Sequence, residues 1–365
     1  MPRPLCLFLT FQLAASAIWS GGLIEAAEST PQAARNPVTL PGQQADGSIL
    51  LPNQWSLRPV GRQVRLGDFP VNIAVHPGSG YAAVLHCGYG PHEVVVVDIH
   101  RAKVVCRVGI EEGFYGLAFA PDGSRLFISG AGDEVVHSFS FREGYLSDPR
   151  QIRLREASQR GVPAGLAVSR DGRRLWVANV RGHQVDELNL ESGKVVFELS
   201  TLAGTKLADG NGIKPPSDPD LAAATKRDEA RLQLPASAEP FPYGCVVDEA
   251  RRRLYVSLWA QAQVAVVDLD QHLVVDHWPT QEHPNEMVAS PSGKILYVAN
   301  ANRNTVTVLD LDTGKTLETL TASLYPQSPP GSTPNSLALT PDGQQFSFCL
   351  VPGLCLVVPA VERDR

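Results

Sequence analysis

His283-Pro-Asn-Glu-Met-Val-Ala-Ser-Pro-Ser-Gly-Lys-Ile-Leu-Tyr-Val-Ala-Asn300 is the stretch that decides the fold. A Pro-containing loop leads into a short apolar run, a Gly turn follows, and an aromatic-rich strand completes the pattern. Thr305-Val-Thr-Val-Leu-Asp310 and the turn Thr313-Gly-Lys315 come soon after it. Because branched and aromatic side chains suit a pleated, half-buried surface, these segments are predicted to be successive strands of one antiparallel sheet.

The same unit occurs six times along the chain. Its turn is occupied by Gly78, Gly123, Gly172, Gly293 and Gly343, and by Ala250 in the fourth copy. A period in the forties, made of short strands, is typical of a four-stranded propeller blade. One such sheet cannot bury both of its faces alone, so the copies must pack side by side around an axis. The sequence therefore predicts an all-β fold: a β-propeller of four-stranded antiparallel blades with six repeats.

The strand runs of each unit follow one order. The innermost strand is the run before the Gly turn, as in Met287–Ala289, and the aromatic strand Ile295–Ala299 follows it. The third strand ends in Asp, as in Val306–Asp310, and the outermost is a run such as Thr316–Leu320. The second copy departs from this pattern, because Phe139 and Phe141 replace the strand that ends in Asp, and Tyr115 stands where Pro is expected.

The ends of the repeat array leave two interpretations open. Gln63-Val64-Arg65-Leu66 looks like an outermost strand without its own blade, and it could complete the last blade. Phe346–Val351 and Leu354–Val358 would then be the second and third strands of that blade, and the six-bladed ring would close. The alternative is a truncated chain with an uncovered sheet edge.

The N-terminal residues resemble an export signal. Arg3 precedes the apolar stretch Leu5–Trp19, and Ala15-Ser16-Ala17 offers small residues for cleavage, so residues 1–17 are predicted to be a signal peptide. Cleavage as late as residue 27 is a second option. We expect a periplasmic or secreted protein with no transmembrane segment after signal removal.

Two segments outside the repeats are predicted to be loops. Residues 18–60 are rich in Pro, Gln, Ala and Gly and are expected to be a flexible lead-in to a propeller of residues 61–365. Residues 201–240 form an insertion between the third and fourth copies, with a short helix expected at Leu221–Leu234. Loops of this length are usually functional or disordered.

Composition excludes some function classes. The net charge of −6 argues against nucleic-acid binding, which requires a basic surface. Without residues 1–17 the cysteines are Cys87, Cys106, Cys245, Cys349 and Cys355. No Cys-x-x-Cys or Cys-x-x-Cys-His is present, so haem attachment through thioethers is excluded and no cofactor is predicted. Either the thiols are free and buried, or one disulfide joins Cys349 to Cys355.

The strand order divides the polar residues between two rims. The Gly turns and the turns after the third strands share one rim, and the loops after the aromatic strands share the other with the Pro loops. Aromatic and amide groups around an axial opening would suit a small polar ligand, a peptide or a protein. The candidate ligand-binding residues of this second rim are His86, Tyr89, His92, Tyr115, Asn179, Tyr243, Trp259, Asn285, Glu286, Asn300, Asn302 and Asn335.

Several of these residues have a purely structural alternative. Asn179 and Asn300 end strands, where amides cap turns. Asn285 and Asn335 follow Pro at the start of inner strands and could bond within their loops, and Trp259 could pack between blades. Asp98, Asp268 and Asp310 end third strands, and their carboxylates are expected to accept hydrogen bonds from the following turn.

A metal site is a further interpretation of the His and Glu residues. His86, His92 and Glu93, together with His283 and Glu286, offer imidazole and carboxylate groups that suit zinc or a similar ion. Their spacing is not diagnostic, and only a central site could unite them. No metal ligand is therefore predicted.

Parts of the repeat resemble a known family. Tyr297-Val-Ala-Asn, Trp176-Val-Ala-Asn and Val306-Thr-Val-Leu-Asp-Leu-Asp-Thr-Gly-Lys are similar to the YVTN-type β-propeller repeat of exported bacterial and archaeal proteins. Gly88-Tyr-Gly-Pro-His-Glu-Val-Val-Val-Val-Asp and residues 326–343 resemble the subgroup in which such a propeller precedes an alkaline-phosphatase-like phosphoesterase domain. The resemblance covers about residues 52–345 and implies seven blades, whereas six copies are visible. No residue matches the phosphoesterase part, so its hydrolase activity is not carried over.

The sequence therefore predicts an exported, non-catalytic β-propeller that serves as a binding or scaffold module. Gly-x-Ser-x-Gly, Gly-rich phosphate loops and His-Glu-x-x-His are absent, so no catalytic residue is predicted. The alternative is a propeller hydrolase of the lactonase type with a central metal-assisted site. A phosphoesterase domain, as a fusion or as a separate chain, is the partner that the resemblance implies.

Overall fold

A computed structural model of the protein describes residues 39–58, 62–202, 239–323, 331, 333–350 and 354–360. The predicted signal peptide, the helix expected at Leu221–Leu234 and most of the 201–240 insertion lie outside these ranges. The chain divides into two compact units, Met1–Gly61 and Arg62–Arg365. Within the described ranges, no helix has the length and apolar character that a membrane span requires.

The first unit carries a small three-stranded antiparallel sheet, in a region that the sequence led us to expect as a flexible lead-in. Its strands are β1 (Gly42–Gln43), β2 (Ile49–Leu50) and β3 (Ser56–Leu57), paired in the order β1-β2-β3. The turn between β1 and β2 is stabilised by Asp46, whose carboxylate accepts hydrogen bonds from the main-chain N–H of Ser48 at 3.0 Å and from its hydroxyl at 2.6 Å.

The described residues of the second unit form six antiparallel sheets, which we number as blades 1 to 6. Blade 1 contains β4 (Pro70–Val75), β5 (Tyr81–His86), β6 (Glu93–Asp98) and β7 (Lys103–Gly109). Blade 2 contains β8 (Leu117–Phe119), β9 (Arg125–Ser129), β10 (Val135–Arg142) and β11 (Tyr145–Arg153). Blade 3 contains β12 (Pro163–Val168), β13 (Arg174–Asn179), β14 (Gln184–Asn189) and β15 (Lys194–Ser200).

Blades 4 to 6 follow the 201–240 insertion. Blade 4 contains β16 (Pro242–Asp248), β17 (Arg253–Leu258), β18 (Gln263–Asp268) and β19 (Leu273–Pro279). Blade 5 contains β20 (Pro284–Ala289), β21 (Ile295–Asn300), β22 (Thr305–Asp310) and β23 (Thr316–Thr321). Blade 6 contains β24 (Pro334–Leu339), β25 (Gln345–Leu350) and β26 (Leu354–Pro359).

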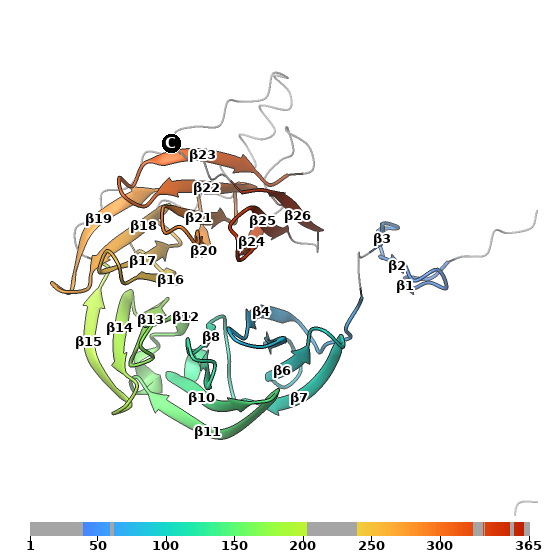
Figure 1. The fold of residues 1–365 in the computed structure, drawn as a ribbon, viewed down its shortest axis with the longest axis horizontal. Helices are drawn as coiled ribbons and strands as arrows, with labels where there is room; N and C mark the ends of the chain where they lie inside the picture. Colours follow the sequence, from blue (N-terminus) through green and yellow to red (C-terminus); the bar gives the residue numbers. More distant parts are fainter. Residues whose placement is uncertain are drawn as a thin grey trace, which may run out of the picture. The chain divides into compact units, whose positions relative to one another are not determined.

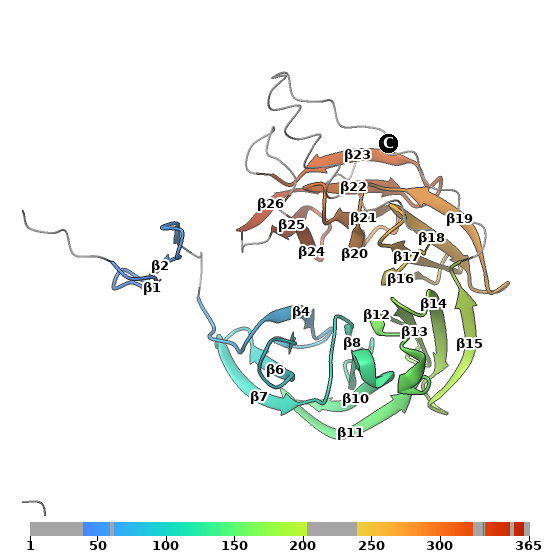
Figure 2. The ribbon, with the colours of Figure 1, turned by 180° about the vertical axis from the view of Figure 1, so that it is seen from behind.

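The blades stand side by side around a common axis, with the first strand of each blade innermost (Figures 1 and 2). Packed inner strands succeed one another from β4 through β8, β12, β16 and β20 to β24. In the part of the chain that the structure describes, β24 and β4 do not form a packed pair of this kind. The predicted propeller architecture is therefore confirmed.

The apolar core lies between the blades. Each pair of successive blades shares one cluster of buried side chains drawn from both sheets. Between blades 4 and 5, for example, Tyr255 and Trp278 pack with Met287 and Val298. The aromatic second strands supply the largest buried rings, including Tyr255 and Tyr297 at 1% and 0% exposure. A blade therefore depends on its neighbours for burial, as the repeat pattern requires.

The turns after the third strands behave as predicted. The Asp310 carboxylate accepts hydrogen bonds from the main-chain N–H groups of Asp312 at 3.0 Å and Thr313 at 2.7 Å. Asp268 accepts from the turn of blade 4 in the same way, and Asp98 from Arg101 at 2.8 Å. These aspartates are structural, and they hold the hairpins that form one rim.

Blade 2 replaces that turn with a tighter one, which explains its divergent sequence. Arg142 pairs directly with Tyr145, so only Glu143 and Gly144 connect β10 to β11. Both residues have positive φ, 50° and 89°, as a two-residue hairpin turn requires. No Asp is needed because the tight turn closes without a side-chain acceptor.

The segment that we considered as a closing strand packs elsewhere. Residues 62–67 belong to no strand, and Val64 and Leu66 cover Val84, Val95 and Val97 of blade 1. The sheet of blade 6 has three described strands, and residues 63–66 do not pair with it. Its register places Cys349 opposite Cys355, although the side chains of both residues lie outside the described part.

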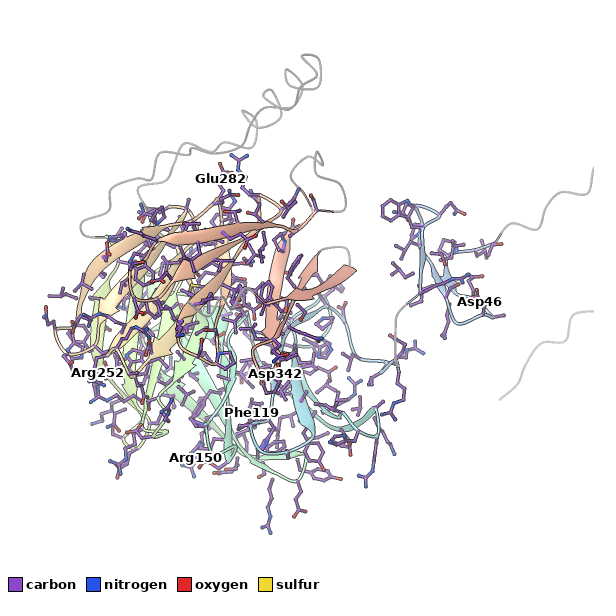
Figure 3. All side chains as sticks on the ribbon, turned by 45° about the horizontal axis from the view of Figure 1, so that its top comes forward. Asp46, Phe119, Arg150, Arg252, Glu282 and Asp342 are labelled. Carbon is purple, nitrogen blue, oxygen red and sulfur yellow. The ribbon has the colours of Figure 1, made fainter. Side chains whose placement is uncertain are left out.

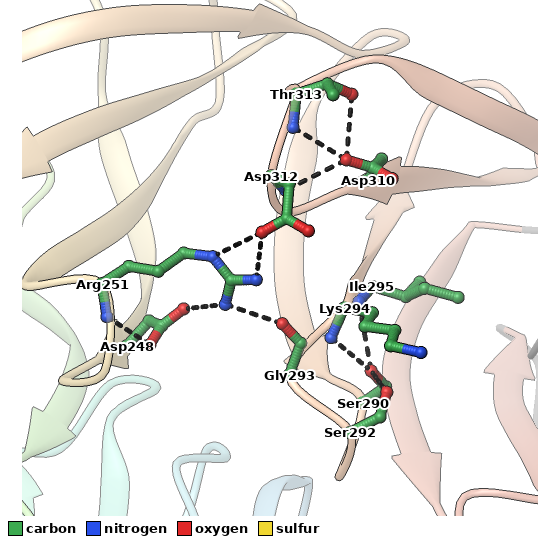
Figure 4. A network of polar contacts seen from close by, with 10 residues as sticks. All are labelled: Asp248, Arg251, Ser290, Ser292, Gly293, Lys294, Ile295, Asp310, Asp312 and Thr313. Carbon is green, nitrogen blue, oxygen red and sulfur yellow. Dashed lines mark hydrogen bonds and ion pairs between the residues drawn. The ribbon is translucent and has the colours of Figure 1, made fainter.

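An arginine fastens blade 4 to blade 5 on the Gly-turn rim (Figure 4). Arg251 donates from Nη1 to Asp248 at 2.8 Å and to the carbonyl oxygen of Gly293 at 2.7 Å. Its Nε also donates to Asp312 at 3.0 Å. The two blades are thus joined by a polar contact in addition to their shared apolar core.

Candidate functional site

Five of the six inner strands begin with a bulge, and the conformation at the start of the strand decides which side chains reach the axis. The ladder between the first and second strands shifts register after Pro163, Pro242 and Pro284, and blades 1 and 6 shift likewise, whereas the ladder of blade 2 is regular. The residue two places after the shifted position is Asn72, Gly165, Gly244, Glu286 and Ser336 in blades 1, 3, 4, 5 and 6, and Gly116 aligns with it in blade 2. Three successive blades therefore place a glycine where blade 5 places Glu286.

The glycines mark places where neighbouring inner strands almost touch. A Cβ on Gly244 would lie 2.5 Å from the carbonyl oxygen of Asn285 in blade 5. One on Gly165 would lie 2.3 Å from the carbonyl oxygen of Tyr243, and one on Gly116 2.0 Å from that of Ala164. Only glycine permits this approach. The inner strands of blades 2 to 5 are consequently packed backbone against backbone.

Glu286 takes this position in blade 5, and its carboxyl reaches hydrogen-bond partners from two other blades. Tyr115, in the loop before β8, donates a hydrogen bond from its hydroxyl to the Glu286 carboxyl, and the main-chain N–H of Leu337 donates a second one. Burial outweighs both bonds and raises the pKa of Glu286 from 4.5 to about 8. The carboxyl is therefore mostly protonated at neutral pH.

Aromatic rings surround this carboxyl. The ring centroid of Tyr243 lies 4.6 Å from that of Tyr115 and 5.8 Å from that of Phe114. Burial and the nearby Glu286 raise the pKa of Tyr243 to about 12, and the pKa of Tyr115 is also raised, mainly by burial. We call Tyr115, Tyr243 and Glu286 the axial cluster, because they come from blades 2, 4 and 5.

The axial cluster is surrounded by protein without being sealed. Tyr115, Tyr243 and Glu286 are all half-buried, so each retains surface that water can reach. A protonated carboxyl offers one O–H donor and an acceptor oxygen, and each tyrosine hydroxyl offers both functions. This arrangement suits recognition of an uncharged polar group by hydrogen bonds.

The blade 1 candidates lie apart from the axial cluster. His86 is buried at 1% exposure and its Nε2 accepts a hydrogen bond from the Gly67 N–H at 3.2 Å. Burial lowers the pKa of His86. The His92 ring accepts from the Gly113 N–H at 3.0 Å, while the Tyr89 side chain is fully exposed. Both histidines support neighbouring loops.

Trp259 and Asn302 converge on His283. The ring of Trp259, from the second hairpin of blade 4, stacks on His283 with a centroid distance of 3.9 Å and an angle of 23°. The Asn302 side chain hydrogen-bonds the same histidine, whose pKa is lowered by burial. Since His283 begins blade 5, Trp259 takes part in packing between blades.

Asn179 belongs to a buried ionic network that joins blades 2 and 3. Arg155 donates to the Asn179 Oδ1 at 2.8 Å, to Glu134 at 3.0 Å and also to Asp186. The side chains of Glu134 and Asp186 have no exposed surface, and that of Arg155 is 8% exposed. Val162 donates its main-chain N–H to Glu134 at 2.8 Å. These contacts support the structural interpretation of Asn179.

The other asparagines differ in exposure. Asn300 is fully buried and donates to the hydroxyls of Thr305 at 3.1 Å and Thr307 at 2.8 Å. Asn285 is 7% exposed and its Oδ1 accepts the Glu286 N–H at 2.7 Å, so it shapes the bulge that directs Glu286. Asn335 is exposed on the inner strand of blade 6.

The suggested metal set does not assemble. Among the residues whose placement is described, no three His, Cys, Asp or Glu side chains are positioned to share an ion. His86 and Glu93 lie in blade 1, whereas His283 and Glu286 lie in blade 5. Of this set, Glu286 alone belongs to the axial cluster.

Sequence reasoning named the members of the axial cluster but not their convergence. It placed them among twelve candidates because they precede or begin inner strands. The signal that could have separated them is the alignment of the bulge positions, where Gly116, Gly165 and Gly244 contrast with Glu286. At this position the other blades have Gly, Asn or Ser, so the charged side chain of Glu286 stands out in the alignment.

Comparisons with known proteins agree with the fold. Residues of this chain are 26% identical over 200 positions to Antigen Lp49 of Leptospira interrogans serogroup Icterohaemorrhagiae serovar copenhageni. The match covers 53% of this chain and 37% of that protein, so the similarity spans about a third of the relative. No protein-family model matches the chain.

A solved structure resembles the propeller. Hydrazine synthase of Kuenenia stuttgartiensis superposes with a TM-score of 0.57 at 16% identity, over 80% of this chain and 76% of that one. At this identity the likeness concerns the fold alone. It supports the β-propeller architecture and carries no information about activity.

Proposed function

We propose that this protein is an exported β-propeller of the YVTN type that acts as a non-catalytic binding or scaffold module. The convergence of Tyr115, Tyr243 and Glu286 from three blades carries the proposal. A neutral carboxyl between two tyrosine hydroxyls suits a polar, uncharged ligand such as a saccharide or a peptide amide. The similarity to an antigen supports export, and the sequence resemblance supports a phosphoesterase domain as partner.

The test uses the pH dependence of binding. N,N'-diacetylchitobiose and N-acetyl-trialanine amide serve as uncharged probes, and their affinities are measured calorimetrically at pH 6.5 and pH 9. Because Glu286 loses its proton as the pH rises through about 8, the wild-type protein is expected to bind more weakly at pH 9. Glu286→Gln keeps a neutral donor and is expected to bind equally at both pH values.

A matched control separates this effect from a general loss of charge. Glu282 lies close in sequence, is 41% exposed and pairs with Arg303 at 2.6 Å; Figure 3 labels it near the top of the view. Glu282→Gln should leave probe binding and its pH dependence unchanged. If neither probe binds, or if the wild-type protein binds them equally well at both pH values, ligand binding at the axial cluster is rejected.

Export and catalysis are tested separately. Residues 1–27 fused to a reporter should direct it out of the bacterial cytoplasm, and retention there would contradict export. The purified protein should not accelerate hydrolysis of lactones or phosphate esters, with or without added zinc. Turnover of either substrate that is lost in Glu286→Gln would favour a lactonase-type hydrolase instead.

A further inference from the structure

A cavity lies on the rim opposite the candidate ligand-binding rim, between blades 2 and 3. Its volume is about 410 Å³, which is within the range of small-molecule sites. The Gly turns of the two blades line it, together with residues of β9, β11 and the turn after β14. The candidate residues predicted from the sequence do not include any of these.

The floor of this cavity is apolar. Phe127, Ile152 and Leu190 line it and come from both blades. Phe127 also belongs to the shared core of blades 2 and 3, and Ile152 and Leu190 pack against that core. The floor is therefore part of a packed, ordered surface, and an apolar group could cover it without rearrangement of the blades.

The rim of the cavity carries arginines whose guanidinium groups form no ion pair with the described residues. The Gly turns and second-strand starts of blades 2 to 4 contain Arg125, Arg170, Arg173, Arg174, Arg251, Arg252 and Arg253. Four of them bind a carboxylate: Arg174 binds Glu187, Arg251 binds Asp248, Arg252 binds Asp270 and Arg253 binds Asp268. Figure 4 shows Arg251 as an example of this pairing.

Arg125, Arg170 and Arg173 are the three that remain, and all three line the cavity. Across the described ranges they form no ion pair. Arg125 is half-buried, and its guanidinium donates only to the neutral Ser138 hydroxyl, from Nε at 3.1 Å and from Nη2 at 2.5 Å. It lies over the Phe127 ring, 5.9 Å from the centroid. Among the described residues, its remaining N–H donors have no hydrogen-bond acceptor.

Acidic residues at the cavity limit how it can attract a ligand. Asp122 and Asp171 line it, but both carboxylates accept hydrogen bonds within their own turns. These bonds lower the pKa of both groups, so both keep their charge. Glu191 lines the cavity as well. Long-range attraction is therefore largely offset, and an anion must be held by direct contact with the guanidinium groups.

We propose that this cavity binds a small organic anion. Its oxyanion group contacts Arg125, Arg170 and Arg173, and its apolar body covers the floor at Ile152 and Leu190. Guanidinium groups match the geometry of carboxylates and phosphates, and both classes share this chemistry. The site is separate from the axial cluster, so its test is independent of the function proposed above.

The test compares four probes by calorimetry and ligand-detected NMR: phenyl phosphate, benzoate, inorganic phosphate and benzyl alcohol. Phenyl phosphate or benzoate is expected to bind saturably, with a Kd of about 1 mM or below. Inorganic phosphate lacks the apolar body and benzyl alcohol lacks the charge, so both should bind at least about tenfold more weakly. Preference for phenyl phosphate would identify phosphate esters as the ligand class, and preference for benzoate would identify carboxylates.

Variants locate the binding. Arg170→Gln and Arg173→Gln alter exposed side chains and should retain the wild-type melting temperature while weakening binding about tenfold each. Arg173→Lys keeps the charge and should restore part of the affinity. Arg142→Gln is the matched control, since Arg142 is exposed in blade 2 but does not line the cavity. Absence of saturable binding by both aromatic anions, or equal weakening in Arg142→Gln, would overturn the proposal.

Discussion

Tyr115 and Glu286 meet across the propeller axis, although one precedes blade 2 and the other begins blade 5. The tyrosine hydroxyl donates to the carboxyl, and the Leu337 N–H from blade 6 donates to it as well. This contact joins non-adjacent blades, which the apolar clusters between successive blades do not do. A substitution at either residue should therefore affect the packing of several blades rather than that of one adjacent pair.

Glu286 makes stability depend on pH. Its pKa rises from 4.5 to about 8 on folding, so between these values the folded state holds a proton that the unfolded chain releases. Stability should therefore fall with rising pH across this window, by at most about 1.4 kcal/mol per unit. Glu286→Gln should remove this fall.

The measurement is urea unfolding of both proteins between pH 5 and pH 8.5. Buried histidines titrate in the same range. Their contributions to the free energy of unfolding are the same in both proteins, so they cancel when the wild-type value is subtracted from that of the variant. The variant should gain stability relative to wild type as the pH rises. A difference that stays constant over this range would show that the Glu286 carboxyl does not change its pKa on folding.

The Arg155 network predicts a large loss of stability. Arg155→Met would leave Glu134 and Asp186 buried without their cation, and burial already raises the pKa of Asp186. We expect a loss of about 3–5 kcal/mol by chemical denaturation. Arg150→Met is the control, because Arg150 and Asp148 form an ion pair with side chains 60% and 51% exposed.

The control should lose less than about 1 kcal/mol, as exposed ion pairs usually do. Similar losses in Arg155→Met and Arg150→Met would mean that the buried network contributes no more than a surface pair. If the loss of stability in Arg155→Met disappears near pH 3, the result would support this role of Arg155. The protonated carboxyl groups of Glu134 and Asp186 would then no longer need a cation.

The propeller could be predicted because its evidence is local and repeated. The Gly turn and the aromatic strand that follows it recur at intervals of 43 to 50 residues, except across the 201–240 insertion, and each copy predicts its own sheet. The inner strand of blade 5 was predicted too short, since Met287–Ala289 omits the bulge that begins at Pro284. A bulge interrupts the alternation of side chains, and in so short a run the interruption cannot be told from the end of a strand.

The candidate site was predicted only as a set of residues on one rim. Which residues reach the axis depends on the bulge and on the approach of Gly244 to Asn285, both of which are relations between blades. The arginine cavity was missed for the same reason. Arg125 and Arg173 look like ordinary turn residues in the sequence, which does not show that their guanidinium groups, unlike those of Arg251 and Arg253, form no ion pair among the described residues.

Gly244 should not tolerate a side chain. In Gly244→Ala the new Cβ would lie 2.5 Å from the Asn285 carbonyl oxygen. Neither atom can move unless its own backbone shifts. The Cβ would also crowd the Ser257 hydroxyl, which accepts the Gly244 N–H at 2.8 Å and donates to Asn285 at 2.7 Å. We expect a loss of about 1–3 kcal/mol by thermal and urea unfolding.

Gly109 provides the comparison for this substitution. It ends β7, and a Cβ there would have its nearest neighbour at 4.0 Å. Gly109→Ala should change stability by less than about 0.5 kcal/mol. If both alanine variants are equally stable, the inner strands of blades 4 and 5 do not approach as closely as the structure has them.

Two cysteines should resist alkylation in the folded protein. Burial raises the pKa of Cys87 and of Cys245 from 9.0 to about 12, so at pH 8 each has roughly a thousandfold less thiolate than an ordinary thiol. Iodoacetamide followed by peptide mass spectrometry should leave both unmodified under native conditions. In 8 M urea both should react fully, because unfolding restores their ordinary acidity. Native labelling of Cys245 at a rate close to that in urea would contradict its enclosure beside Tyr115, and with it the packing that holds the axial cluster together.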